Sequence, residues 1–470
     1  MSWATALVVV NGIALSYFIV LNGLYLVTTG IALASLRRYA ARLKALDVSD
    51  VLLLGGAPPV TLLAPAYNEA ATCVQSVRSL LALEYADYEV LVINDGSRDA
   101  TLAELTRAFG LVPAVRAPTA TLVTKPIRQL LRSPTHPNLW VIDKENGGKA
   151  DALNAGLAHV RTPLFCAMDA DSLLERDALA RIVRPFLEDD RTVAAGGIIR
   201  IANGCTVHAG AVTRVGLPRS LLARIQVVEY LRSFLGGRVG WDALGATLII
   251  SGAFGMFKRS AVVSAGGYDT STVGEDMELV IRLHRYCRDH GIPYRIAFAP
   301  DPVAWTECPE SFTVLGRQRM RWQRGLAEVL WRYRGMLFRP RYGAIGFLAM
   351  PYFFFLEMLG PVVEAAGYVA FVLTVVLGLA SGPYVAAFLL LAFALGTALS
   401  LAAIGLEELT FRRYPRTTQV LRLMGVAVIE TVGYHQLATW WRLRGLWAAL
   451  RQRGGWGEMT RKGFSAKGTS

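Results

Sequence analysis

The sequence predicts an α/β domain that is inserted between an N-terminal transmembrane helix and a C-terminal, α-helical membrane region. Three observations support this fold class. Of the 470 residues, 53% are hydrophobic and only 18% are charged, whereas soluble domains carry about a quarter charged residues. The apolar excess lies in residues 1–36 and again in residues 342–441. Between these stretches, short apolar runs alternate with helical patterns, which is typical of a mostly parallel sheet covered by helices.

Charge and cysteine content narrow the class of protein. The formal net charge of +13 suits nucleic acid or an anionic membrane surface as a partner. The apolar excess favours the membrane, and no basic run interleaved with aromatic residues indicates a nucleic-acid site. The cysteines form no CxxC pair, so we expect mostly buried thiols in a reducing compartment and no zinc site. They are Cys73, Cys166, Cys205, Cys287 and Cys308.

Residues 1–36 are expected to form the first transmembrane helix. No charged residue occurs from Trp3 to Leu36, and this stretch exceeds the roughly 20 apolar residues that cross a bilayer as a helix. A cleaved signal peptide is the alternative, but the stretch is too long for its apolar segment and no basic residue precedes it. Because basic residues begin at Arg37 and Arg38, the positive-inside rule places the following domain in the cytoplasm.

Residues 48–310 are expected to form this cytoplasmic α/β domain. Its apolar runs are bounded by Gly, Asn, Asp and Pro, which is typical of buried strands. The segments that follow several of these runs have helical periodicity, and the alternation implies parallel strands joined by helical crossovers. The expected strands are residues 60–64, 88–94, 139–143 and 164–168, and the expected helices are residues 70–83, 99–109, 149–160 and 176–186.

The C-terminal part is expected to contain more than one membrane element. Arginine clusters near residue 413 and after residue 441 should both stay cytoplasmic, so an even number of crossings separates them. The simplest arrangement is a hairpin of spans at residues 362–380 and 384–406. The stretches 345–360 and 421–438 contain ionisable residues and are expected to re-enter the membrane or lie at its interface, which leaves the number of spans open. The expected segments are an interfacial region at 311–341, the membrane region at 342–441 and a basic cytoplasmic tail at 442–470.

Polar residues follow the first two expected strands. Tyr67, Asn68 and Glu69 come after the first, and Asp95 with a glycine turn ends the second. In an open α/β sheet, ligands bind beyond the carboxyl ends of the strands, so these groups suit a nucleoside. The alternative is a pair of ordinary turns, with Asn68 as a helix N-cap.

Two further motifs suit a diphosphate and a divalent cation. Gly147 and Gly148 open a helical pattern that begins with Lys149, and backbone N–H groups, helix dipole and ammonium together suit a diphosphate. The spacing is not that of a P-loop, and a solvated lysine at a capped helix is the alternative. Asp169 and Asp171 end the fourth expected strand, and carboxylates two residues apart can jointly bind Mg²⁺.

Two motifs near the membrane region complete the set. Glu275 and Asp276 head a helical pattern, where the helix N-terminus favours an ionised carboxylate that can accept a proton. An ordinary carboxylate at a helix start is the alternative. Gln318, Arg321 and Trp322 form a cluster suited to phosphate oxygens and a sugar face, or alternatively a basic helix at the membrane interface.

In order and spacing, these motifs resemble the membrane-embedded family 2 glycosyltransferases, the group that contains bacterial cellulose, hyaluronan, chitin and poly-N-acetylglucosamine synthases. The resemblance covers nearly the whole chain and implies a Rossmann-like GT-A fold for the catalytic domain. It departs from the family pattern at Asn94, where many relatives have Asp, and at Gly274, where many have Thr. The motifs that carry it are PAYNE, NDGS, GGKADALN, DAD, GED and QRMRW.

The resemblance implies a role for each motif residue. Asp276, beside Glu275, matches the general base that deprotonates the acceptor hydroxyl, and direct displacement by that acceptor implies inversion. The cofactor implied is Mg²⁺ or Mn²⁺, bound by Asp171. In the remaining roles, Tyr67, Glu69 and Asp95 hold the uridine, Lys149 holds the diphosphate, Asp169 contacts the nucleotide, and Gln318, Arg321 and Trp322 grip the diphosphate and the acceptor end.

The implied activity is processive transfer from UDP-N-acetylglucosamine or UDP-glucose to a growing β-linked polysaccharide, coupled to its translocation. The implied partners are the donor, the polysaccharide and the lipid bilayer, with no nucleic acid and an unknown export partner. The implied location is the inner (plasma) membrane, crossed several times. A β-barrel regulatory domain is not expected, because too few residues follow Trp441. Two alternatives stay open, namely single addition to a lipid acceptor and a catalytically silent export scaffold or sensor.

Overall fold

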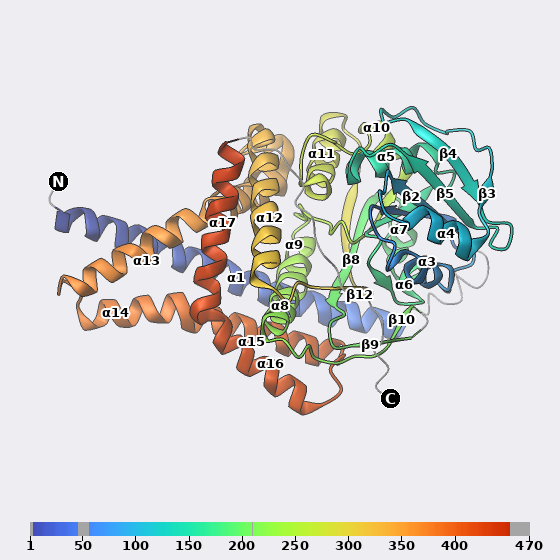
Figure 1. The fold of residues 1–470 in the computed structure, drawn as a ribbon. Coiled ribbons are helices and arrows are strands. Elements are labelled where there is room, and N and C mark those ends of the chain that lie inside the picture. Colours follow the sequence, from blue (N-terminus) through green and yellow to red (C-terminus); the bar gives the residue numbers. More distant parts are fainter. Residues whose placement is uncertain (1–2, 46–55, 209, 452–470) are drawn as a thin grey trace. The chain divides into compact units, whose positions relative to one another are not determined.

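The computed structural model describes residues 3–45, 56–208 and 210–451, which divide into two compact units (Figure 1). Within the described residues, the α/β unit comprises Tyr39–Leu217 and Thr247–Cys308. The helical unit comprises the remaining segments, and it includes Pro218–Ala246, which interrupts the α/β unit in sequence.

The α/β unit is built on one mixed sheet, to which the described residues contribute ten strands. Its centre is parallel, in the order β5-β2-β1-β6, and antiparallel pairs extend it on both sides. The full order is β3-β4-β5-β2-β1-β6-β11-β8-β12-β7, and β9 pairs with β10 separately. The bounds are β1 Val60–Ala66, β2 Tyr88–Asp95, β3 Val112–Pro113, β4 Ile127–Arg132, β5 Leu139–Lys144, β6 Leu164–Met168, β7 Leu173–Leu174, β8 Thr192–Ile201, β9 Thr206–His208, β10 Ala211–Arg214, β11 Phe254–Lys258 and β12 Arg295–Thr306.

All four expected strands are present, as β1, β2, β5 and β6. Three of the expected helices are also present, but the single helix expected at residues 176–186 is wrong. The chain there forms two short helices, because Pro185 lacks an N–H and occupies the first turn of a new helix instead of continuing the previous one. The helices of this unit are α3 Cys73–Leu81, α4 Thr101–Phe109, α5 Lys149–His159, α6 Ala178–Ile182, α7 Arg184–Glu188, α10 Arg259–Ser264 and α11 Glu275–Asp289.

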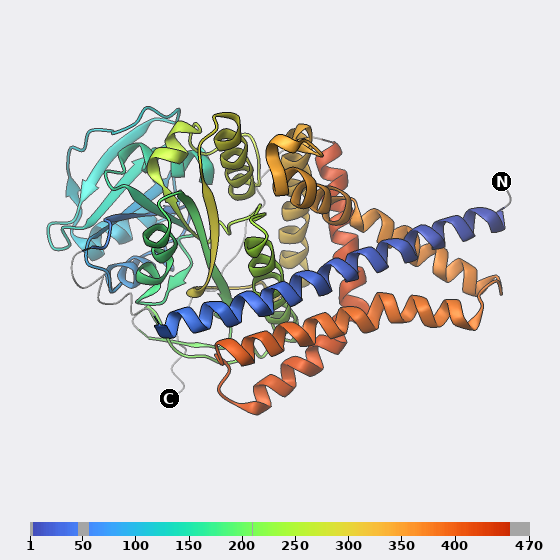
Figure 2. The ribbon, with the colours of Figure 1, turned by 180° about the vertical axis from the view of Figure 1, so that it is seen from behind.

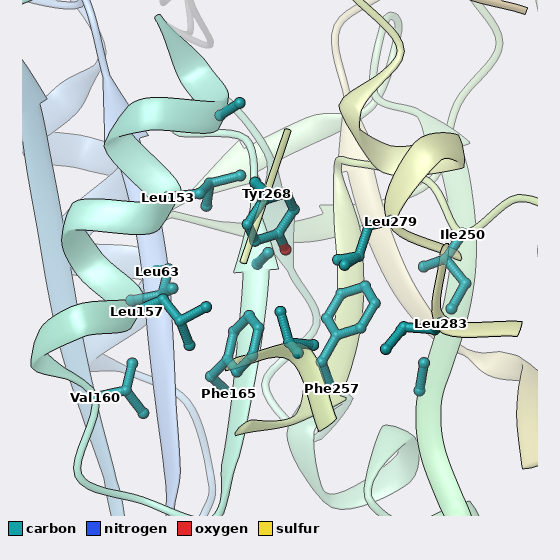
Figure 3. Close-up of a cluster of buried hydrophobic side chains, with 14 of the residues drawn as sticks. Leu63, Leu153, Leu157, Val160, Phe165, Ile250, Phe257, Tyr268, Leu279 and Leu283 are labelled. Carbon is teal, nitrogen blue, oxygen red and sulfur yellow. The ribbon is translucent and has the colours of Figure 1, made fainter. Parts of the chain in front are cut away.

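A buried apolar cluster fixes α5 and α11 on the sheet (Figure 3). Leu153 and Leu157 of α5 lie against strand residues, and Phe165 of β6 stacks on Phe257 of β11 with ring centroids 5.5 Å apart. Burying each such side chain contributes about 1.5–3 kcal/mol. This core therefore holds the first residues of both helices, Lys149 and Glu275, in place.

Most of the cysteines are buried, as expected. All five are free thiols, and all except Cys205 are buried. Burial raises the pKa of the Cys166 thiol, so it stays protonated and unreactive near neutral pH.

The helical unit contains the apolar elements that were expected to cross the membrane. Among the described residues, Thr5–Leu43 and Gly382–Thr410 are long and apolar enough to span a bilayer. Ile345–Met358 and Gly360–Val376 also qualify together, with a bend of 42° between them. The unit therefore holds two candidate spans, or three if the bent pair is one span.

Part of α1 (Trp3–Ala45) packs between the two arms of the expected C-terminal hairpin. The Asn11 amide donates to the Thr374 hydroxyl of α13 at 2.8 Å, and the Tyr384 hydroxyl of α14 donates to Asn11 Oδ1 at 2.7 Å. Figure 2 shows α1 in blue beside these two helices in orange. Their bounds are α13 Gly360–Val376 and α14 Gly382–Leu389, and α15 Leu395–Thr410 continues the second arm.

The stretch expected at residues 421–438 is broken rather than continuous. Val432 and Gly433 have non-helical backbone angles, with φ of 83° at Gly433, so α16 and α17 are separate helices. The helix that carries Gln318, Arg321 and Trp322 is α12, and α17 packs along it. The remaining bounds are α8 Leu221–Leu231, α9 Val239–Ala243, α12 Phe312–Arg332, α16 Thr417–Ile429 and α17 His435–Leu450, with short irregular helical segments η1 Arg232–Arg238, η2 Arg334–Met336, η3 Pro340–Tyr342, η4 Ile345–Ala349, η5 Tyr352–Met358, η6 Leu390–Ala394 and η7 Glu430–Tyr434.

Candidate active site

The parallel strands bring four of the predicted motifs to one edge of the sheet. In the register, Ala66 of β1 lies beside Asn94 of β2, which in turn lies beside Asp143 of β5. Because β6 is parallel to β1, the residues that follow Met168 leave the sheet at the same edge. The motifs at Tyr67, Asp95, Lys149 and Asp169 therefore all lie at the carboxyl ends of parallel strands, where ligands bind in such folds.

The turns after β1 and β2 are tied to each other. The backbone N–H of Asn68 donates to the Ser97 hydroxyl at 3.0 Å, and Asn68 Oδ1 accepts from the Arg98 N–H at 2.8 Å. The Glu69 N–H donates to the Thr101 hydroxyl at 2.8 Å. Tyr67, which precedes these bonded residues, is 41% exposed, and an exposed aromatic side chain at this edge suits contact with a planar base.

Asp95 is buried, and its carboxylate binds the loop that precedes α5. Oδ1 accepts from Lys144 Nζ at 2.7 Å and from the Gly147 N–H at 3.0 Å. Oδ2 accepts from the Gly148 N–H at 2.8 Å and from the Asn146 amide at 3.2 Å. Direct binding of uridine by Asp95 stays a prediction, whereas its contact with the glycine loop is part of the structure.

Asn94, the departure from the family pattern, has a defined partner. Its side-chain amide donates to Asp143 Oδ1 at 2.7 Å on the neighbouring strand, and both residues are buried. An aspartate at position 94 would place two carboxylates side by side there, so the amide removes a like-charge contact.

Lys149, the residue predicted to hold the diphosphate, contacts the motif of Asp169 and the motif of Glu275 and Asp276. Its Nζ lies 2.6 Å from Asp169 Oδ1 and 3.4 Å from Glu275 Oε1. Burial alone would lower the pKa of the ammonium, but Asp169 and Glu275 raise it above its usual value, so Lys149 is charged. Burial raises the pKa of Glu275, an effect that Lys149 opposes and Asp276 increases.

Asp276 is held at the N-terminus of α11. Its Oδ2 accepts from the Gly252 N–H at 3.1 Å, and its Oδ1 accepts from the Met277 N–H at 2.8 Å. A Cβ at Gly252 would lie 2.7 Å from Lys149 Nζ, so a larger residue there would push the ammonium from its present position. The carboxylate therefore lies at the positive end of the helix dipole, and a carboxylate held in this way is suited to the role of a general base.

Asp169 and Asp171 are the predicted ligands of a divalent cation. Among the described residues, no group of three or more His, Cys, Asp or Glu side chains is arranged to hold a metal ion by itself. Mg²⁺ is commonly bound by one or two carboxylates together with substrate phosphates and waters. Asp169 lies 2.6 Å from Lys149, which is suited to phosphate, and Asp171 follows two residues later, so this pair of carboxylates fits a cation that is shared with a bound diphosphate.

Gln318, Arg321 and Trp322 lie on α12 in the helical unit. The Trp322 side chain is 43% exposed, and the Arg319 guanidinium lies 4.6 Å from its ring centroid. The contacts expected between this motif and a diphosphate or acceptor stay predictions.

Sequence reasoning missed two buried charged residues at the site, Lys144 and Asp151. Lys144 Nζ lies 2.6 Å from Asp151 Oδ1 and 2.7 Å from Asp95 Oδ1. One signal for them was available, because Lys144 follows an apolar strand pattern and Asp151 lies inside the glycine–lysine motif.

Comparison with known proteins identifies the family. The profile described as "Glycosyltransferase like family 2" matches residues 58–325, which is more than half of the chain. The chain belongs to glycosyltransferase family 2. The expectation drawn from motif order is thus confirmed.

Relatives and solved structures add detail to the family 2 assignment. The chain is 32% identical over 273 residues to the poly-beta-1,6-N-acetyl-D-glucosamine synthase of Staphylococcus aureus (strain COL) and 30% identical over 273 residues to that of Staphylococcus epidermidis. Each alignment covers 58% of this chain and 56% of the relative, so the chain spans about half the length of these relatives. A mannosyltransferase from Pyrobaculum calidifontis, solved with GDP-Man and Mn²⁺, matches 90% of this chain and 99% of its own with a TM-score of 0.53 at 20% identity. This likeness confirms the GT-A fold.

Proposed function

We propose that this family 2 chain is a membrane-embedded, inverting glycosyltransferase that extends a β-linked polysaccharide from a UDP-sugar. The observation that carries the proposal is the convergence of Lys149, Asp169, Glu275 and Asp276 at the carboxyl edge of the sheet. The names of the relatives support UDP-N-acetylglucosamine as the donor and poly-N-acetylglucosamine as the product.

In this proposal the donor lies along the sheet edge. Tyr67, Glu69 and Asp95 hold the uridine, and Lys149 holds the diphosphate. Asp169 contacts the nucleotide. Gln318, Arg321 and Trp322 grip the diphosphate and the acceptor end, where a planar guanidinium and an indole suit phosphate oxygens and a sugar face.

Asp276 is the general base of the proposed reaction. It takes the proton of the acceptor hydroxyl as the hydroxyl oxygen attacks the anomeric carbon and the bond to UDP breaks. A single displacement inverts the configuration, so an α-linked donor gives a β-linked product. The ammonium of Lys149 stabilises the negative charge that develops on the leaving diphosphate.

Asp169 and Asp171 are the residues that would hold Mg²⁺ or Mn²⁺. When bound, the cation neutralises charge on the diphosphate. The presence of Mn²⁺ in the solved mannosyltransferase supports a divalent requirement here.

The membrane assignment is part of the same proposal. Residues 1–36 cross the inner membrane, residues 48–310 form the cytoplasmic GT-A domain, residues 311–341 lie at the interface, residues 342–441 return to the membrane and residues 442–470 stay cytoplasmic. The candidate spans and the basic residues at the C-terminal end of α1 support this orientation.

Polar groups buried in the helical unit support passage of the polymer through the membrane region. Glu364 is 3% exposed and accepts from the Tyr17 and Thr439 hydroxyls. Such residues within apolar helices commonly mark a pathway or cavity.

UDP release by the full chain in lipid nanodiscs tests the proposal. Each of several UDP-sugars would be supplied with Mg²⁺, with Mn²⁺ or with EDTA. We expect release with UDP-N-acetylglucosamine that requires a divalent cation. Release with UDP-glucose alone would correct the donor, and no release with any donor would contradict the proposal and favour a silent scaffold. When the same assay is applied to the carboxylate variant Asp276→Asn, Glu188→Gln on the exposed surface of α7 is the matched control.

A further inference from the structure

Lys144 is a buried cation to which none of the proposed roles assigns a task. Its side chain is 0% exposed, and its Nζ lies 2.7 Å from Asp95 Oδ1 and 2.6 Å from Asp151 Oδ1. Nζ also donates to the Glu145 carbonyl oxygen at 2.5 Å. Removing an ammonium from water is unfavourable by several kcal/mol, so a lysine is retained in such a place only when its partners are close and well directed.

The carboxylate of Asp95 makes its hydrogen bonds with residues of one loop. An ionised carboxylate offers about four acceptor positions. In Asp95 these positions meet four donors from residues 144–148, two on each oxygen. The carboxylate thereby holds the glycine loop through both of its oxygens.

Asp151 lies against the glycine loop and also binds the backbone of a second segment. Both of its oxygens accept from the Lys125 N–H, at 3.2 and 3.0 Å. A Cβ at Gly147 would lie 2.4 Å from Asp151 Oδ1, so the loop backbone rests directly on this carboxyl. Gly148 follows with φ of 87° as the N-cap of α5, and Lys149 is the first residue of that helix.

We propose that Asp95, Lys144 and Asp151 form a buried positioning triad that fixes the Gly147–Gly148 loop and thereby aims Lys149 at the diphosphate of the donor. The inference rests on the proposed function, and it gives Asp95 a hold on the loop in addition to its proposed contact with the uridine. Lys144 and Asp151 are positioning residues, since neither is placed against the substrate.

Lys144→Met tests the triad. The substitution removes the one ammonium that contacts both buried carboxylates and that donates to the Glu145 carbonyl of the loop. We expect the Kd for UDP in the presence of Mg²⁺ to rise at least tenfold, and the donor KM to rise with it. Binding would be measured by calorimetry on the full chain in nanodiscs, well below the melting temperature of each variant.

Arg116→Met is the matched control. Arg116 is another buried cation of the same unit, and it binds Glu89 and the carbonyl of His159 at 2.6–3.0 Å without touching the glycine loop. We expect it to lower the melting temperature while the Kd for UDP stays within twofold of the wild type. Equal loss of UDP affinity in both variants would overturn the proposal, since it would reflect general destabilisation.

The double variant Lys144→Met/Asp151→Asn keeps the net charge of the triad. It provides a second test if Lys144→Met alone fails to fold. We expect its melting temperature to recover toward the wild type while UDP binding stays at least tenfold weaker, because the loop still lacks the lysine. Wild-type affinity in the double variant, or in a folded Lys144→Met, would overturn the triad. Failure of the wild type itself to bind UDP would instead contradict the proposed function.

Discussion

The two units of the molecule differ in how far apart in sequence their buried charged and polar partners lie. In the α/β unit, the charged residues follow strand ends, and Lys144, Lys149 and Asp151 lie within eight residues of sequence. In the helical unit, charged and polar partners come from distant segments, as when Tyr17 of α1 donates to Glu364 of α13. The difference teaches that motif order can locate a site on a parallel sheet, whereas pairings between helices depend on packing that local sequence does not encode.

Arg442 illustrates the second case. From α17 it donates to Gln323 of α12 at 3.0 Å, and to the Glu357 carbonyl at 2.6 Å and carboxylate at 3.1 Å in η5. One guanidinium thus joins three segments, including the helix that carries the Gln318, Arg321 and Trp322 motif.

The largest effect is expected at the strand edge of the α/β unit. Asp276→Asn keeps the shape of the side chain but removes the proton acceptor, so we expect the rate of UDP release to fall by about 10²–10⁴-fold. The donor Kd should change little, because Asp276 acts on the acceptor. Steady-state UDP release and UDP calorimetry measure the two quantities. An active Asp276→Asn would refute the assignment of the base.

A smaller effect, on stability, is expected in the helical unit. Arg442→Met leaves the Glu357 carboxylate without its cation, and we expect unfolding to become easier by about 2–3 kcal/mol, since the pair is only partly exposed. Arg444→Met, two residues along the same helix on its exposed side, is the control and should change stability little. Thermal unfolding in nanodiscs compares them, and equal melting temperatures would contradict a pinning role for Arg442.

The smallest effect is expected in the core of the α/β unit, away from its charged edge. Burial lowers the pKa of His284 to about 4, and its ring bonds the Tyr294 hydroxyl and the Thr247 carbonyl, both at 2.8 Å. The unfolded chain takes up a proton below its own pKa of about 6.5, before the folded chain does, so stability falls as the pH drops from 6.5 toward 4.

Between pH 7.5 and pH 5.5, the loss from His284 should be about 1 kcal/mol. The melting temperature at the two pH values measures it for the wild type and for His284→Gln, in which the amide can still donate to Thr247. A pH dependence that persists unchanged in His284→Gln would show that other groups cause it.

Much of the α/β unit could be predicted from sequence because its signals are local. Apolar runs predict strands β1, β2, β5 and β6. Because these strands are parallel, the residues that follow them lie at one edge of the sheet. Lys149 and Asp169 could therefore be expected near each other, and they are 2.6 Å apart.

Other features could not be predicted, for physical reasons that differ from place to place. The grouping of Pro218–Ala246 with the helical unit depends on tertiary packing, and the break at Val432–Gly433 lies in a sequence as apolar as a span. The contacts of Asp95 were missed because its partners, from Lys144 to Gly148, lie about fifty residues away in sequence.

The size of the product made from UDP-N-acetylglucosamine tests the central claim most directly. The purified full chain in nanodiscs would receive labelled donor and Mg²⁺, and the products would be separated by size. We expect a high-mass polymer in the wild type and none in Asp276→Asn. Products that carry a single added sugar on lipid would contradict processive synthesis.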